Sequence, residues 1–313
     1  MEKLESPPQK VISSAEVSGA TAIISDLKSL FKIGIINSNT MTAFAGFWLA
    51  LYYTDASFSN LWHILLVTLI GTAFVIAGGC VLNNYYDRDI DPVMSRTKQR
   101  PTVTGSIQLS HILTIGIAFS VIGVLILSLA SIQTAIYGAI GWFAYVVLYT
   151  MWSKRRYTIN TAIGSLSGAI PPIIGWSAVD PNLHPAAFIL FLIMFIWQTP
   201  HFLALAMKKR DEYKAAGIPM LPVVHGFAMT KRQMAIYVTC LLPLPLYLIN
   251  LGYIFLTIAT LLNIGWLILA IRGFFIKDDM KWASNMFFYS LIYLTTIFLT
   301  MIIVTIPEVI VLN

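Results

Sequence analysis

Residues 61–82 read LWHILLVTLIGTAFVIAGGCVL, and residues 83–101, which follow directly, read NNYYDRDIDPVMSRTKQRP. The first stretch contains no Asp, Glu, Lys or Arg, and about 20 apolar residues are enough for a helix to cross the hydrocarbon core of a bilayer. The second stretch gathers acids and bases where that helix would leave the membrane. Ionisable side chains at such a place usually belong to a functional site and are seldom there for packing alone. The junction therefore predicts a transmembrane helix that ends in a functional motif.

Similar apolar runs recur along the whole chain. Hydrophobic residues make up 58% and charged residues 11% of the 313 residues, and the mean hydropathy is +0.77, whereas about a quarter of the residues are charged in soluble domains. The runs lack the alternating pattern of a membrane barrel, so helices are the expected spanning elements. We predict an all-α integral membrane bundle of about nine transmembrane helices, beginning near Ile33, Leu61, Ile107, Ile132, Thr161, Pro185, Gln233, Tyr253 and Asn285.

The positive charge lies on one side of this predicted bundle. When the connections are assigned alternately to the two sides, all 20 Lys and Arg residues fall on the side of the N-terminus. The positive-inside rule then predicts a cytoplasmic N-terminus and an external C-terminus. We expect a multi-pass protein of a bacterial inner membrane, with membrane lipid around it. Residues 1–32 are a predicted cytoplasmic tail, with an interfacial helix over Thr21–Lys32, and residues 33–313 are the predicted membrane domain. The net charge of +6 thus reflects topology, and no nucleic-acid partner is expected.

The motif after residue 82 has the composition of a site for a hard cation. On a helix, Asn84, Asp87 and Asp91 would share one face, because they are spaced i, i+3 and i+7. Mg²⁺ is commonly held by one or two carboxylates, with water and substrate phosphate at its other positions. Pro92 disfavours helical backbone at the residue before it, so the helix is expected to end or kink there, with Asp91 in a loop. The alternative is a helix end with charges at the membrane interface.

Basic residues follow the acids and are candidates for binding a diphosphate. Arg96, Lys98 and Arg100 would neutralise such a group beside the metal ion. Each of them is equally explained by the positive-inside rule. The other candidate diphosphate-binding residues are Arg88, Lys154 and Lys208.

Two further clusters lie at the predicted cytoplasmic ends of the sixth and fourth spans. His201 follows Pro200 inside an apolar run, where polar residues are usually functional, although it could simply satisfy a local hydrogen bond. Asp211 and Glu212 would hold a second metal ion or balance the nearby cations. Tyr149, in the fourth span, would belong to an aromatic anchoring belt or face a cation-like intermediate beside Lys154.

These motifs resemble those of the intramembrane prenyltransferase superfamily of ubiquinone and menaquinone synthesis, whose first motif is Asn-Asp-x-x-Asp-x-x-x-Asp. The matching residues are Asn83, Asn84, Asp87 and Asp91, with Asn84 where the wider family has aspartate. The run from Asn83 to Pro101 is similar to the branch that farnesylates haem. Further similar stretches are Tyr149 to Arg156, Pro200-His201-Phe202 and Gly217 to Val223.

The resemblance implies an enzyme that transfers a farnesyl group from farnesyl diphosphate to a vinyl group of haem B, with water completing the product, haem O, for terminal oxidases. Mg²⁺ would be the cofactor, held on the diphosphate by Asp87 and Asp91 with help from Asn84. Asp87, Asp91 and Lys154 are the expected catalytic residues. Contacts with haem or the prenyl chain are expected from Asn83, Tyr149 and His201, since imidazole can ligate haem iron.

The chain departs from the family pattern at two places. The second family motif is Asp-x-x-x-Asp, but the residue four positions beyond Asp211 is Ala215. The family's Tyr-x-x-x-Lys appears as Tyr149 and Lys154, which are one residue further apart.

Two other functions are compatible with the sequence. One is a prenyltransferase that acts on a quinone precursor. The other is a cation transporter in which Asp87, Asp91 and His201 line a pathway, although transporters more often place acids at mid-membrane. A haem A synthase is a candidate partner. The expected active site is the cytoplasmic mouth of the bundle, between the ends of the second and sixth spans.

Overall fold

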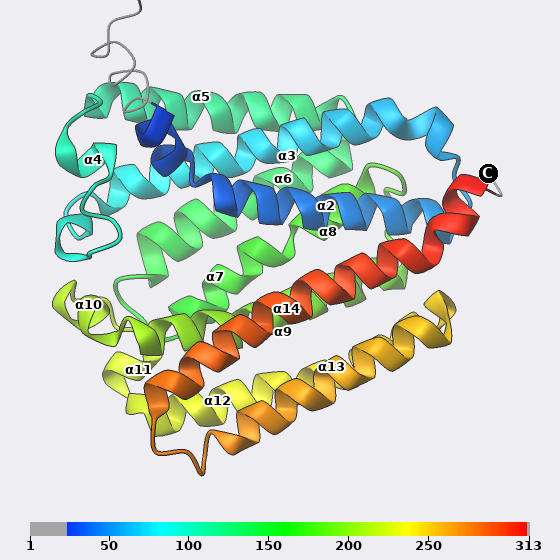
Figure 1. Ribbon diagram of the computed structural model, residues 1–313. Helices are drawn as coiled ribbons and strands as arrows, with labels where there is room; N and C mark the ends of the chain where they lie inside the picture. Colours follow the sequence, from blue (N-terminus) through cyan, green and yellow to red (C-terminus); the bar gives the residue numbers. More distant parts are fainter. Residues whose placement is uncertain (1–23, 312–313) are drawn as a thin grey trace, which may run out of the picture.

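Within residues 24–311, which the computed structural model describes, the chain folds into long helices joined by short turns (Figure 1). The elements that form the bundle are α2 (Ile33–Thr54), α3 (Phe58–Asp87), α5 (Leu109–Ser128), α6 (Ile132–Phe143), η2 (Ala144–Ser153), α7 (Asn160–Ala169), α8 (Pro171–Ser177), α9 (Pro185–Lys208), α12 (Gly226–Leu241), η3 (Leu244–Leu251), α13 (Gly252–Arg272), α14 (Asp279–Ile306) and η4 (Pro307–Val311). Four short helices lie in the connections: η1 (Asp91–Val93), α4 (Pro101–Thr104), α10 (Arg210–Ala215) and α11 (Leu221–Val224).

The described residues contain 6 helical runs long and apolar enough to cross a membrane. They are Phe58–Asp87, Leu109–Ser128, Ile132–Ser153, Pro185–Lys208, Gly226–Arg272 and Asp279–Ile310. The fifth run includes η3, which connects α12 to α13. Figure 1 shows that α12 and α13 lie side by side. The predicted first and fifth spans fall outside this set: α2 has polar residues in its first half, and α7 and α8 are separated at Ile170, just before Pro171. An all-helical membrane fold is thus confirmed, and the count of nine spans remains a prediction.

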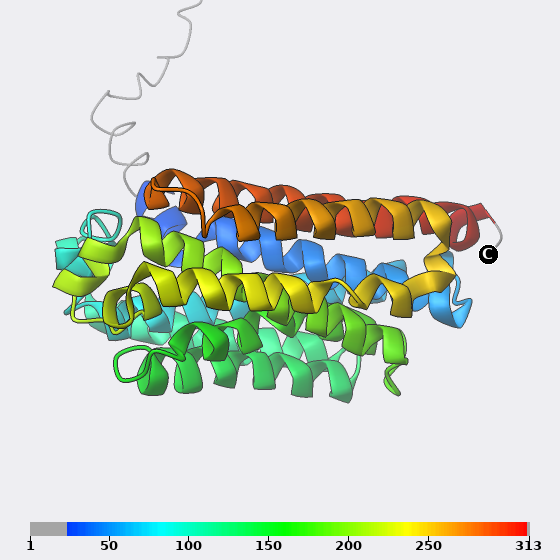
Figure 2. The same cartoon turned by 90° about the horizontal axis from the view of Figure 1, so that it is seen from below.

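The helices run between two ends of the bundle that differ in character. Figures 1 and 2 show the connections carrying α4, α10 and α11 together at one end, with the turn between α13 and α14 and the start of α2. η4 and the turns between α2 and α3 and between α8 and α9 lie at the other end. The connections rich in Lys and Arg are at the first end, as predicted. That this end faces the cytoplasm remains a prediction.

The bundle is closed by the last long helix. α14 packs against α9 and also against α2, so the first and last long helices of the described residues are in contact. Buried aromatic side chains fill the contacts of α13 and α14, including Trp266, Trp282 and Tyr293, each at most 1% exposed. Burial of such large apolar groups stabilises the packing of the helices that carry them.

The start of the described chain is folded against α3. Residues 24–31 are helical, and Leu30 packs with Val81 of α3 and Ile112 of α5. Lys32 then adopts a left-handed backbone with φ of 54°, which turns the chain into α2. Of the interfacial helix predicted over Thr21–Lys32, residues 24–31 are helical, Lys32 is a turn residue, and residues 21–23 lie outside the described residues. Its location at a membrane surface remains a prediction.

α2 and α8 are packed so closely that the contact requires glycine. A Cβ on Gly175 of α8 would lie 1.8 Å from the Ala43 carbonyl oxygen of α2, and a Cβ on Gly46 of α2 would lie 2.0 Å from the Pro172 carbonyl oxygen. Small residues let helix backbones approach in this way within membranes. The contact matters for function because both helices also line the large cavity described below.

We predict that Gly175→Ala destabilises the protein, because the added methyl group must push α8 away from the α2 backbone. The expected loss is about 1–3 kcal/mol of unfolding free energy, measured as a lower thermal midpoint of the purified protein in detergent. Gly34→Ala is the matched control, since a Cβ there meets nothing within 4 Å. Equal midpoints for the two variants would contradict this account of the α2–α8 contact.

Candidate active site

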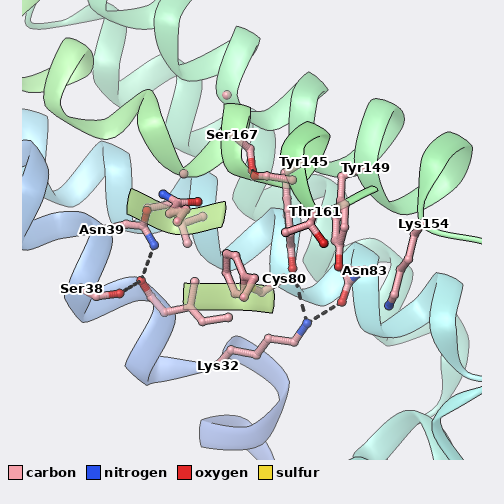
Figure 3. Close-up of a pocket in the computed structure, with 18 of the residues that line it drawn as sticks. Lys32, Ser38, Asn39, Cys80, Asn83, Tyr145, Tyr149, Lys154, Thr161 and Ser167 are labelled. Carbon is pink, nitrogen blue, oxygen red and sulfur yellow. Dashed lines mark hydrogen bonds between the residues drawn. The ribbon is translucent and has the colours of Figure 1, made fainter. Parts of the chain in front are cut away.

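A cavity of about 560 Å³ opens between α2, α3, η2, α7, α8 and α9 (Figure 3). Its inner wall is mostly apolar and includes Val75, Ile174 and Met194. Six charged side chains also line it: Lys32, Asp87, Asp91, Arg96, Arg100 and Lys154. They belong to the ends of α2, α3 and η2 and to the connection after α3, so the charge lies at the end of the bundle rich in Lys and Arg. An apolar chamber with a charged mouth suits an amphiphilic substrate.

Asp87 is the buried centre of this mouth. Its carboxylate is fully buried at the last residue of α3, and Oδ2 accepts hydrogen bonds from Lys154 Nζ and, at 3.0 Å, from Asn83 Nδ2. Oδ1 accepts no hydrogen bond from any described residue and lies 3.6 Å from Arg155 Nη2. A buried charge is tolerated only when it is paired and hydrogen-bonded, so these contacts hold the ends of α3 and η2 together.

The π-helical geometry of η2 explains how Lys154 reaches Asp87. The Lys154 amide donates to the Tyr149 carbonyl at 2.9 Å, an i to i+5 bond. Such a bond places residues five apart one above the other, as an α-helix does for residues four apart. Tyr149 and Lys154 therefore share a face despite their longer spacing, and the Lys154 ammonium lies 5.9 Å from the Tyr149 ring centre. The one extra residue between Tyr149 and Lys154, relative to the family motif, is thus accommodated by the wider π-helical turn.

Asp91 is held from a different element. α3 ends at Asp87, five residues before Pro92, and Asp91 begins the short helix η1. The helix thus ends before Pro92, as predicted, but Asp91 lies in a short helix and not in a loop. Its carboxylate is almost fully buried and accepts a 2.7 Å hydrogen bond from Arg100 Nη1. Arg96 also lines the cavity and donates to the Tyr213 hydroxyl at 3.3 Å. Two acids and two arginines thus reach the mouth from a 14-residue stretch around the end of α3.

Lys32 is a member of the site that sequence reasoning assigned only to topology. Its ammonium donates to Asn83 Oδ1 and, at 3.5 Å, to the Tyr145 hydroxyl (Figure 3). Burial lowers the pKa of Lys32 to about 7, and the nearby cations Arg100 and Lys154 lower it further, whereas Asp87 opposes the shift. An ammonium in such a place gains most from an anion bound beside it. No motif marks Lys32 in the sequence; only its position one residue before the first predicted span hinted at a role.

Asn83, rather than Asn84, accompanies Asp87 in the cavity. The two residues are four apart on α3 and share a face, and Asn83 also donates to the Thr150 hydroxyl at 3.0 Å. Asn84 is fully buried outside the cavity, where its amide donates to the Leu30 carbonyl at 2.9 Å. The face predicted to combine Asn84 with Asp87 and Asp91 is therefore not formed, since the helix ends before Asp91. Asn84 instead attaches residues 24–31 to α3.

The structure places the remaining predicted charged residues outside the cavity. Asp211 is exposed on α10. Glu212 accepts hydrogen bonds from Lys209 and Ser95. These contacts, chiefly the one with Lys209, lower the pKa of Glu212. Lys208 points to α14, where it donates to Ser284 at 3.3 Å. Lys98 is exposed, and Arg88 bonds its own helix at the Tyr85 carbonyl. These side chains are not brought to the acids at the mouth.

The inner wall contains the predicted residues Tyr149 and His201. Tyr149 stacks on Tyr145, with ring centres 5.9 Å apart, and both line the cavity. His201 lines it from α9, one residue after Pro200, and its Nδ1 lies 2.7 Å from the Ser290 hydroxyl of α14. The cavity thus combines aromatic faces and an imidazole with the charged mouth.

The residues at the mouth fit a Mg²⁺ ion bound together with phosphate. Two carboxylates line the mouth, and one buried oxygen of Asp87 accepts no hydrogen bond from the described residues. Groups of three or more His, Cys, Asp or Glu arranged for a metal do not occur in residues 24–311. The two carboxylates suit magnesium, which is usually held by one or two carboxylates plus substrate phosphates rather than by an all-protein cage.

Comparison with solved structures supports the same fold. A structure described for digeranylgeranylglyceryl phosphate synthase in membranes is 19% identical, covers 91% of this chain and 99% of its own, and has a TM-score of 0.73. A UbiA homolog from Archaeoglobus fulgidus bound to GPP and Mg²⁺ is 14% identical, with a TM-score of 0.63 over 88% of this chain and 99% of its own. At these identities the likeness shows the fold alone.

The chain is much more similar in sequence to bacterial relatives. A protoheme IX farnesyltransferase of Oceanobacillus iheyensis is 56% identical over 311 residues, covering 98% of this chain and 99% of that protein. Another, of Geobacillus kaustophilus, is 59% identical over 284 residues, covering 91% and 92%. The model of the UbiA prenyltransferase family matches residues 39–292. The chain therefore belongs to the UbiA prenyltransferase family.

Proposed function

We propose that this prenyltransferase transfers the farnesyl group of farnesyl diphosphate to a vinyl group of protohaem IX, haem B, and so makes haem O. The observation that carries the proposal is the cavity with paired acids and bases at its mouth and an apolar, aromatic interior. Relatives called protoheme IX farnesyltransferase, 56% and 59% identical over nearly the whole chain, support haem as the acceptor.

The diphosphate would bind at the charged mouth. Four cations line it, namely Lys32, Arg96, Arg100 and Lys154. Arg100 and Lys154 are each paired with an acid, so they are held in place before the substrate arrives. Cations that are already oriented stabilise the charge that develops on a leaving group without further reorganisation. This is the role we assign to the four side chains.

Asp87 and Asp91 would hold Mg²⁺ with the diphosphate, and the Asn83 amide oxygen is a neutral donor in the same place. When bound, the ion would neutralise the diphosphate oxygens and so favour departure of the diphosphate. Asn84 is left out of this set because its amide bonds the Leu30 carbonyl away from the cavity. Asp211 and Glu212 are left out because they lie outside the cavity on α10.

The aromatic wall would stabilise the allylic cation left when the diphosphate departs. The stacked rings of Tyr145 and Tyr149 line the cavity on the same element as Lys154, and Figure 3 shows Tyr149 beside Lys154. Aromatic faces attract a cation by about 0.5–2 kcal/mol, more when water is excluded. The apolar wall beyond them would hold the prenyl chain and the porphyrin and keep bulk water from the cation.

The setting in the cell is part of the proposal. The mouth is at the end of the bundle that carries the basic connections, so by the positive-inside rule we place the active site at the cytoplasmic face of a bacterial cell membrane. A haem A synthase as partner remains a prediction. Membership of a prenyltransferase family weighs against the cation transporter, while a quinone precursor as acceptor remains the alternative that experiment must separate.

The product of the reaction tests whether haem is the acceptor. Purified protein in lipid, given haem B, farnesyl diphosphate and Mg²⁺, is expected to form a haem heavier by one farnesyl group plus one hydroxyl group, the latter supplied by water, detected by mass spectrometry. A parallel reaction with an aromatic quinone precursor in place of haem is expected to give no prenylated product. Prenylation of the quinone precursor alone would overturn haem as the acceptor.

Matched pairs of variants test the residues assigned to the mouth. Asp87→Asn is expected to lower turnover roughly a hundredfold, as removal of one stabilising group in a preorganised site does, whereas Asp211→Asn is expected to leave turnover unchanged. Lys32→Met is expected to raise KM for farnesyl diphosphate, with Lys28→Met, an exposed lysine on the preceding helical segment, as its control. Equal effects within either pair would remove Asp87 or Lys32 from the site.

A further inference from the structure

One histidine stands apart from the others in its surroundings. The chain has 5 histidines, all within the described residues, and His63, His111, His184 and His225 are exposed. Only His201 lines the large cavity. A single imidazole is therefore available to a molecule bound there.

The His201 ring is fixed on both faces. It stacks on Trp197, with ring centres 4.9 Å apart at 20°, and on Phe287 of α14, at 4.7 Å and 26°. Trp197 is itself held, because its indole nitrogen donates to the Ser290 carbonyl at 2.8 Å. Stacking on two rings, one of them held by a hydrogen bond, leaves the imidazole little freedom to turn, so its two nitrogens have defined directions.

The hydrogen bonds of Ser290 set the tautomer of His201. The Ser290 hydroxyl donates its proton to the Phe287 carbonyl. It must then accept from His201 Nδ1, 2.7 Å away, because a hydroxyl has one proton to give. Nδ1 consequently carries the ring proton, and Nε2 keeps its lone pair.

Nε2 is free to meet a ligand. It has no hydrogen-bond partner in residues 24–311. It is not one of the fully buried unpaired polar atoms, and the residue lines the cavity, so the atom is accessible from it. A neutral imidazole whose other nitrogen donates to a fixed acceptor is the arrangement that proteins use for a metal-binding histidine.

We propose that His201 Nε2 is an axial ligand to the iron of the haem substrate, with Ser290 as the positioning residue. The inference rests on the proposed function, since it takes haem to be the acceptor. One axial bond would hold the porphyrin against α9 and leave its rim, with the vinyl groups, free to turn toward the allylic cation. Cys80 and Met194 also line the cavity and offer sulfur donors, so they are the competing ligands to test.

The test is an optical titration of the full-length protein in lipid nanodiscs with ferric haem B and no prenyl diphosphate. Wild type is expected to give the spectrum of imidazole-ligated haem, and His201→Ala to lose it with at least about tenfold weaker haem affinity. Added imidazole is expected to restore the spectrum to His201→Ala, because the deleted ring leaves space for it. His184→Gln, Cys80→Ser and Met194→Leu are the matched controls and are expected to keep the wild-type spectrum.

Ser290→Ala separates positioning from ligation. It is expected to keep the imidazole signature but to bind haem about tenfold more weakly, as loss of a partner behind a metal ligand does, with unchanged affinity for farnesyl diphosphate. Unchanged haem affinity in this variant would remove Ser290 from the proposal.

The outcomes distinguish ligation from the function on which it rests. A His201→Ala or His201→Gln protein, monodisperse by gel filtration, that keeps the wild-type haem spectrum would overturn ligation by His201, even if haem O is formed. An imidazole-ligated spectrum lost in both variants supports the ligation, and it does so even in a preparation that yields no farnesylated haem, where the proposed function would fail instead.

Discussion

The buried carboxylate of Asp87 is the constraint on which the site depends. A charge fully enclosed at the end of a helix must be compensated by partners, and these come from α3 itself through Asn83 and from the end of η2 through Lys154 and Arg155. The amide oxygen of Asn83 in turn accepts a hydrogen bond from the ammonium of Lys32. One carboxylate therefore ties together the start of α2, the end of α3 and the end of η2. These three segments are distant in sequence, and together they form the charged mouth of the cavity.

The same network explains why both acids at the mouth are paired with a base. The pairs of Asp87 with Lys154 and of Asp91 with Arg100 keep each charged group oriented at a place where an isolated charge would be costly. A diphosphate with a divalent cation brings both signs of charge, so each member of a pair has a partner in the bound state as well. Behind the mouth, apolar and aromatic walls take the rest of the substrate, and His201 lies on one of these walls, fixed between Trp197 and Phe287.

Most of the fold and the acidic centre of the site could be predicted from the sequence. Apolar runs mark the helices because the bilayer allows few alternatives, and the motif marked Asp87 and Asp91. What failed depends on contacts between segments. Lys32 resembled any cation before a span, and only the packing of Leu30 and the left-handed turn bring it inside. Asn84 was preferred to Asn83 because a face was assumed to continue to Asp91, beyond the end of α3. The sequence shows the extra residue between Tyr149 and Lys154. It does not show that a π-helical turn accommodates this residue, since no sequence rule predicts where such a turn occurs.

Asp87 and Lys154 form one buried unit that joins α3 to η2. A double-mutant cycle with Asp87→Asn, Lys154→Met and the combination, followed by thermal unfolding in detergent, tests it most directly. Removing one partner of a buried pair costs about 3–5 kcal/mol because the other charge is left alone, so we expect each single variant to have a lower thermal midpoint and the double variant to be less destabilised than the sum of the two. Losses that simply add would contradict the claim.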